Sequence, residues 1–184
     1  FDKLIQEGLN VELTIVSRLD YNDYATKYGK KEYEEALLLI KKNKISITHH
    51  TSLPNQDVLE LIKTAHVGLL PTWAEAYGYS VLEFQALGVP VITTDVRAMP
   101  EINNEVIGWV IKIPKDELGR AKRYSKEDRK ELSAIIEQGI IKSIKEILIK
   151  KETIAQKGIN ALKKVDETNN KDIFVKKMNA YYFK

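Results

Sequence analysis

The sequence contains no cysteine, which excludes a disulfide framework, a thiol nucleophile and a cysteine-bound zinc site. Long apolar runs are also missing. The strongest ones, residues 67–71 and 89–93, are far shorter than the roughly 20 residues of a membrane-spanning helix. The first ten residues, FDKLIQEGLN, lack the apolar stretch of a signal peptide. We therefore expect a cytoplasmic protein. Because the first residue is Phe1 and not Met, we also expect the sequence to begin partway into a longer polypeptide.

The sequence has little net charge, but its basic and acidic side chains are unevenly distributed along the chain. The net charge of the 184 residues is +3, yet residues 1–114 carry 11 basic and 15 acidic side chains, and residues 115–184 carry 18 and 11. The basic C-terminal part predicts an acidic partner, such as the inner membrane surface, or simply lysine-rich helix faces in solvent. It has no basic stripe with interleaved aromatic residues, so we expect no nucleic-acid partner.

Short apolar runs alternate with helical patterns in the first part of the chain. Strands are predicted at residues 11–16, 45–48, 67–70, 91–93 and 109–111, and helices at 32–42, 56–64 and 80–87. This alternation predicts an α/β fold, a Rossmann-like parallel sheet with helices on both faces. Runs such as LTIVS and VITT are apolar on both strand faces, as a covered sheet requires.

After residue 114 the strand patterns end and the sequence becomes mainly helical in pattern. We expect a charged loop at residues 115–125, then helices at 126–149, 152–165 and 172–182. The predicted organisation is a ligand-binding α/β core over residues 1–114, with the helices of residues 115–184 packed on the same domain.

The most informative segment is LLPTWAEAYGYSVLEFQALGVPVITTDVRAMPEI, residues 69–102. A buried strand is followed by a loop with Glu75 and Gly78, and a helix is predicted from Ser80. Ligands of open α/β sheets bind outside the carboxyl ends of the strands, where this loop lies. Because Gly78 has no side chain, the loop backbone can approach a ligand closely there. The free N–H groups at the start of the helix can donate hydrogen bonds to a phosphate.

Two carboxylates flank this predicted phosphate site. Glu83, in the first turn of the helix, can accept two hydrogen bonds from a vicinal diol such as a ribose, and Glu75 can reach other hydroxyls. The pattern indicates a ligand with a sugar on each side of a phosphate group. The alternative is a capping box, in which Ser80 and Glu83 only stabilise the helix start.

At this segment the sequence resembles a known family. The run Glu75-Ala76-Tyr77-Gly78, followed by Leu82-Glu83 and then Gly88-Val89-Pro90-Val91-Ile92, is similar to the E-x7-E region of family 4 glycosyltransferases, retaining enzymes with the GT-B fold. The resemblance extends from about Val11 to the strand at Trp109. It implies the donor-binding domain of an enzyme that moves a sugar from a UDP- or GDP-sugar to an acceptor.

The resemblance also implies roles for the matched residues. In the catalytic site, Glu83 would bind the ribose and Glu75 the transferred sugar, both as positioning groups. Backbone N–H groups around Tyr77, Gly78, Tyr79 and Ser80 would hold the diphosphate. Groups near His50 and Thr51 would lie beside the nucleobase. No metal and no cofactor beyond the nucleotide-sugar is expected, and the adjacent His49 and His50 point to opposite strand faces, a poor geometry for a metal.

Three departures from the family pattern affect these expectations. Ala76 and Tyr77 replace a common Gly and Phe, and Arg97-Ala98 replaces a usual glycine pair near the donor sugar. The family's Arg and Lys that neutralise the leaving diphosphate have no counterpart here, since Arg18 lies in a different loop. The resemblance implies an acceptor domain N-terminal to this chain, and an Arg and a Lys found just upstream of Phe1 would favour an enzyme over a binding module. The chain alone should therefore bind a donor poorly and catalyse little.

Alternatives from other functional classes stay open on the sequence alone. A sugar-nucleotide epimerase or a phosphorylase could use the same fold with differently placed groups. A non-catalytic Rossmann-like binding module is the third possibility.

Overall fold

The computed structural model describes residues 1–21 and 24–182. Strands β1 (Leu13–Val16) and β2 (Ile47–His50) pair in one sheet. Strands β3 (Gly68–Leu70), β4 (Val91–Thr94) and β5 (Gly108–Ile111) form a second sheet in that order. Each pairing between these five strands is parallel, so the predicted α/β architecture is confirmed.

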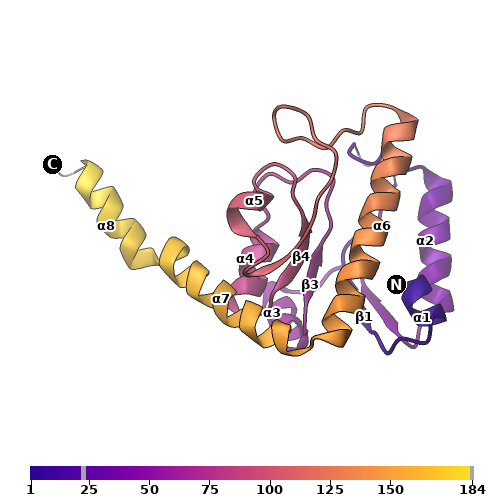
Figure 1. Cartoon of the computed structure of the whole chain (residues 1–184), viewed down its shortest axis with the longest axis horizontal. Coiled ribbons are helices and arrows are strands. Elements are labelled where there is room, and N and C mark those ends of the chain that lie inside the picture. The colour runs from indigo at the N-terminus through magenta and orange to yellow at the C-terminus, as the bar shows by residue number, and fades with distance from the viewer. Residues whose placement is uncertain (22–23, 183–184) are drawn as a thin grey trace.

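Helices flank both sheets, and the chain ends in three consecutive helices (Figure 1). Two short helices were not predicted, because each offers less than two turns of periodic pattern: α1 (Asp2–Gln6) and α5 (Met99–Ile102). The other helices are α2 (Lys30–Lys42), α3 (Asn55–Thr64), α4 (Tyr79–Ala86), α6 (Lys126–Ile149), α7 (Glu152–Asn169) and α8 (Lys171–Tyr182). Across the described residues, each helix falls short of the apolar length needed to span a bilayer.

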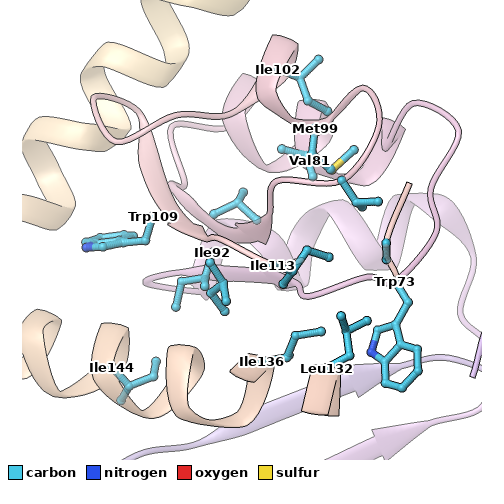
Figure 2. Packing of buried hydrophobic residues seen from close by; sticks show 14 of the residues in the cluster. Trp73, Val81, Ile92, Met99, Ile102, Trp109, Ile113, Leu132, Ile136 and Ile144 are labelled. Atoms are coloured by element: carbon cyan, nitrogen blue, oxygen red, sulfur yellow. The ribbon is translucent and has the colours of Figure 1, made fainter. Parts of the chain in front are cut away.

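The main core lies between the three-stranded sheet and α6. All four residues of β4 are buried, as predicted for VITT, and the apolar side of α6 covers the sheet through Leu132, Ile136 and Ile144 (Figure 2). Gly139, a weak point in the helical pattern, lies against β5, and a Cβ there would come 2.6 Å from Ile111 Cγ2. The glycine therefore permits close helix–sheet packing.

The two-stranded sheet departs from the sequence expectations. In β1 one face is half-buried and the other, with Thr14 and Val16, is exposed, so the prediction that LTIVS is covered on both faces is wrong. The predicted strand at 45–48 begins two residues later. A turn closes first, with the N–H groups of Ser46 and Ile47 both donating to the Asn43 carbonyl, and Ile45 is left 94% exposed.

The C-terminal helices differ in how they meet the rest of the chain. α6 lies against β4 and β5, and α7 lies against α4 and β5. A Cβ on Gly158 of α7 would overlap the Gly88 carbonyl oxygen, so α7 packs tightly on the turn after α4. α8 continues away from the body of the molecule with α7 as its neighbour (Figure 1). The division of the chain at residue 114 stays a prediction.

Candidate functional site

The loop after β3 is organised by Thr72. Its N–H donates to the Leu70 carbonyl over 2.9 Å, and its Oγ1 accepts from the Ala74 N–H over 3.2 Å. The Thr94 hydroxyl at the end of β4 donates to the Thr72 carbonyl over 2.6 Å. The loop is therefore fixed to the carboxyl end of the neighbouring strand, where ligands of such sheets bind.

Trp73, in the same loop, is buried against the core. Its side chain is 8% exposed, and its ring meets Tyr28 edge-on with centroids 5.9 Å apart. Figure 2 shows the indole beside Leu132 of α6. The Tyr28 hydroxyl in turn shares a short hydrogen bond with the Ser133 hydroxyl. Burial of this large aromatic side chain limits the conformations that the loop backbone can adopt, so the residues that follow are held in place.

Glu75 folds back on its own loop. Its Oε1 accepts hydrogen bonds from the N–H groups of Ala76 (2.8 Å) and Tyr77 (3.4 Å). The sequence suggested a carboxylate that projects toward a ligand. In the structure one carboxylate oxygen stabilises the loop, and within the described residues the other has no partner. Glu75 can therefore accept a hydroxyl through Oε2 without releasing the loop.

Gly78 is required for a reason that the sequence did not reveal. It adopts the left-handed conformation with φ of +84°, and a Cβ there would overlap Cε of Met99 in α5. The prediction assigned this glycine to the approach of a ligand. The structure shows that it also lets the loop turn sharply into α4 while α5 packs underneath.

Helix α4 begins at Tyr79, one residue earlier than predicted, with Gly78 as its N-cap. No side chain caps it, so the capping box of Ser80 and Glu83 is wrong. The left-handed Gly78 starts the helix early, which places Ser80 inside the first turn and Glu83 in the second. Within the described residues, the N–H groups of Tyr79 and Ser80 have no acceptor. They are available to an anion.

Glu83 lies on the same helix, half-buried. In the described part of the chain its carboxylate forms no hydrogen bond or ion pair. An unpaired carboxylate one turn beyond open amide donors can accept hydrogen bonds from hydroxyl groups of a ligand whose phosphate binds the amides. The rings of Tyr77 and Tyr79 flank this helix start, with centroids 5.3 Å apart.

His50 ends β2 of the two-stranded sheet and Thr51 follows it, whereas the site follows β3 of the three-stranded sheet. His49 uses Nε2 in a 2.8 Å hydrogen bond with the Ser17 carbonyl. No polar contact between described residues joins His50 or Thr51 to the loop or to α4, and their role at a nucleobase stays a prediction. Among the described residues, no three acidic or histidine side chains gather as metal ligands would.

Arg97, at the predicted departure from the family pattern, has an unusual backbone. Its φ is +48°, a conformation that costs a residue with a side chain about 1–2 kcal/mol. Its N–H donates to the Gly119 carbonyl over 2.9 Å. The side chain is exposed and has no partner in the described part of the chain. Arg97 lies in the loop after β4, two residues before Met99, whose side chain packs against Gly78.

The loop that holds Arg97 is itself built around Asp116. Its carboxylate accepts hydrogen bonds from the Tyr124 hydroxyl (2.7 Å), from Arg120 Nε (2.8 Å) and from the N–H groups of Leu118 and Arg120. These hydrogen bonds hold the pKa of Asp116 below its usual range, and the bond from Tyr124 has the largest effect. Lys115 forms an ion pair with Asp95 at the end of β4. The sequence predicted only a charged loop here.

Two buried polar residues near the site were missed from the sequence. Gln85 of α4 and Asn103 after α5 are 0% and 1% exposed and share a hydrogen-bond network. The sequence signal that could have revealed Gln85 was its place in the run VLEFQAL, four residues after Val81. An apolar residue is usual on that side of a helix.

Known proteins with similar sequences share a family description. The profile described as "Glycosyl transferases group 1" matches residues 1–142. A capsular polysaccharide biosynthesis glycosyltransferase, CapM of Staphylococcus aureus, is 28% identical over 112 residues, which is 60% of this chain and 27% of CapM. The chain thus spans about a quarter of that curated relative.

Solved structures share the fold at low sequence identity. Sucrose-phosphate synthase from Thermosynechococcus elongatus superposes with a TM-score of 0.62 at 18% identity, over 98% of this chain and 47% of that one. TarM superposes with a TM-score of 0.57 at 11% identity, over 96% and 30%. HepE of Anabaena, solved in complex with UDP-glucose, gives 0.54 at 15% identity, over 90% and 47%.

Proposed function

Because the chain belongs to the group 1 glycosyl transferases, we propose that it forms the donor-binding part of a family 4 enzyme that transfers a sugar with retention of anomeric configuration. The observation that carries the proposal is the start of α4. Its open amides of Tyr79 and Ser80 lie on the same helix as the unpaired, half-buried carboxylate of Glu83, with Glu75 in the loop just before. Phosphate and sugar hydroxyls are the ligand groups that suit this set.

In this proposal the chemistry is the departure of a nucleoside diphosphate from the sugar. Backbone N–H groups of Tyr79 and Ser80 stabilise the charge that develops on the leaving group. Glu83 accepts hydrogen bonds from the ribose, and Glu75 accepts one from the transferred sugar through Oε2. Both glutamates position the donor. They do not act as the acid and nucleophile of a glycosidase.

The donor is proposed to be a UDP- or GDP-sugar, used without a further cofactor. HepE, a structural neighbour, has been solved with UDP and with UDP-glucose, which supports this substrate class. The basic side chains that neutralise the diphosphate and the domain that binds the acceptor are proposed to lie in polypeptide outside this chain. The chain by itself is then a weak donor binder.

The charge of the C-terminal part suggests a further contact. Phe174, Tyr181 and Tyr182 of α8 are 62%, 78% and 74% exposed, and Lys176 and Lys177 lie on the same helix. We propose that this surface contacts either the acceptor-binding domain or an anionic membrane surface inside the cell.

The test of the donor site is a binding measurement on the natural polypeptide that contains this chain. Titration with a panel of UDP- and GDP-sugars should identify a donor. Glu83→Gln should weaken its binding by about 1–3 kcal/mol, the range for losing hydrogen bonds to a charged group. The matched control is Glu12→Gln, an exposed glutamate before β1. Parent-like binding by Glu83→Gln would contradict the proposal, and hydrolysis of the bound donor would separate an enzyme from a binding module.

A further inference from the structure

Gln85 is a buried polar residue on the helix that carries the candidate site. Its side chain is 0% exposed. Its Nε2 donates to the Ile102 carbonyl over 2.8 Å and lies 3.4 Å from Asn103 Oδ1. These two hydrogen bonds connect α4 with the last residue of α5 and with the residue that follows it.

Asn103 extends this connection to the sheet. Its Nδ2 lies 3.0 Å from the Val91 carbonyl oxygen, 2.9 Å from Thr93 Oγ1 and 3.2 Å from the Trp109 carbonyl oxygen. The amide is fitted closely, because a Cβ on Gly108 would overlap Asn103 Oδ1. One buried bridge therefore connects α4 with both β4 and β5.

The neighbouring contacts of α4 are mainly apolar. Val81 faces the core, and Gly88 after the helix packs on Gly158 of α7. Apolar contacts are not directional, so they resist small rotations or slides of a helix only weakly. Hydrogen bonds restrict both distance and angle. The bridge through Gln85 is thus the contact best able to fix the rotation and axial position of α4.

The bridge also has a cost. Gln85 Oε1 is buried and has no partner within the described residues, and an unsatisfied buried acceptor destabilises the fold. An apolar residue of the same volume would remove this cost but would leave the Ile102 carbonyl without the Gln85 donor. The two effects on stability oppose each other, whereas the directional hydrogen bond has a clear effect on the position of α4.

We propose that Gln85 and Asn103 are positioning residues that set the orientation of α4, and with it the direction of the Glu83 carboxylate and of the open amides at the helix start. Neither residue touches the donor. The inference rests on the proposed function, because donor binding is what the orientation of α4 controls.

The experiment compares stability with donor affinity in the natural polypeptide that contains this chain. Gln85→Met keeps the length of the side chain and removes its hydrogen bonds. We expect a thermal midpoint close to that of the parent, because loss of the hydrogen bond to Ile102 and removal of the unpaired Gln85 Oε1 oppose each other. The Kd for UDP-glucose should rise about tenfold, as small misplacements of binding groups do. We also expect faster hydrogen exchange of the α4 amides with unchanged exchange in α6. A purely structural role would change the midpoint and leave the Kd of the folded protein as it was.

A second variant and a control keep the outcome clear. Thr93→Val keeps the shape of the side chain and removes one acceptor of Asn103, and it should raise the Kd in the same direction by a smaller factor. Ile144→Val, in the core of α6 and far from the bridge in sequence, should lower the midpoint without changing the Kd.

The possible results separate the two proposals. A parent-like Kd in both Gln85→Met and Thr93→Val would overturn the positioning role. Failure of the parent to bind any UDP- or GDP-sugar would instead overturn the proposed function. In that case the exchange of the α4 amides still tests the bridge, and exchange equal to that of the parent in both variants would overturn it.

Discussion

The Cα of Gly78 packs against the side chain of Met99, so closely that a Cβ on Gly78 would overlap the Met99 Cε. Gly78 also has a φ of +84°. Two independent physical reasons, a steric contact and a left-handed backbone, therefore require glycine at the start of the candidate donor helix.

Substitution at Gly78 separates these two reasons. Gly78→Ala should destabilise the protein by about 2–4 kcal/mol, the sum of backbone strain and overpacking. Gly8→Ala is the matched control, because Gly8 has a φ of +77° and nothing within 4 Å of its Cβ position. Urea unfolding of both variants gives the steric contribution as the difference. Equal losses at the two positions would show that Met99 adapts without cost.

Replacement of Arg97 tests whether a strained backbone is retained for binding. Arg97→Gly should relieve the positive φ and raise the free energy of unfolding by about 1 kcal/mol. Lys27→Gly, at a φ of 54°, is the matched control and should stabilise similarly. Only Arg97→Gly should weaken binding of the nucleotide-sugar, since Arg97 is in the loop after β4 and its exposed guanidinium is the group proposed here to contact the donor. If both variants bind like the parent, Arg97 has no part in donor binding.

The Asp116 cluster predicts a pH dependence. The hydrogen bonds from Tyr124 and Arg120 lower the pKa of Asp116 in the folded state, so its contribution to stability is fully present above about pH 4, the ordinary range for Asp, and is lost as the pH falls further. Asp116→Asn should therefore be less stable than the parent at pH 7, and the difference should shrink below pH 4. A difference that stays constant from pH 7 to pH 3 would contradict this assignment. Urea unfolding at a series of pH values measures it.

Vesicle sedimentation decides between the two proposed contacts of the C-terminal helices. Attraction of well-placed lysines to anionic lipid contributes about 1 kcal/mol each and is screened by salt. Binding to anionic vesicles at low salt, lost at high salt and weakened by Lys176→Gln with Lys177→Gln, would support membrane contact. The matched control is Lys30→Gln with Lys31→Gln on α2. Equal partitioning onto neutral and anionic vesicles, or none at low salt, would leave the lysines as solvated surface.

The sequence by itself determined the features that depend on local pattern. The run VITT is β-branched at every position and became a fully buried strand, β4. The periodic apolar residues of the predicted helix at 126–149, among them Leu132, Ile136 and Ile144, cover the sheet in α6. The order of glutamates and glycine in residues 75–83 located the candidate site, because spacing along the chain is enough to place them in one loop and one helix.

The tertiary structure decided the features that depend on contacts distant in sequence. Gly78 takes a left-handed conformation against Met99, which is 21 positions later in the chain. This moves the start of α4 to Tyr79 and rules out the alternative interpretation of Ser80 and Glu83 as a capping box. Glu75 turns back to the amides of its own loop, whose shape is fixed by Thr94. The bridge from Gln85 to Asn103 exists only once α4, α5 and two strands have come together. A hydrogen bond or a steric contact acts over a few ångströms in space, and sequence spacing alone does not specify which distant residues come within that range.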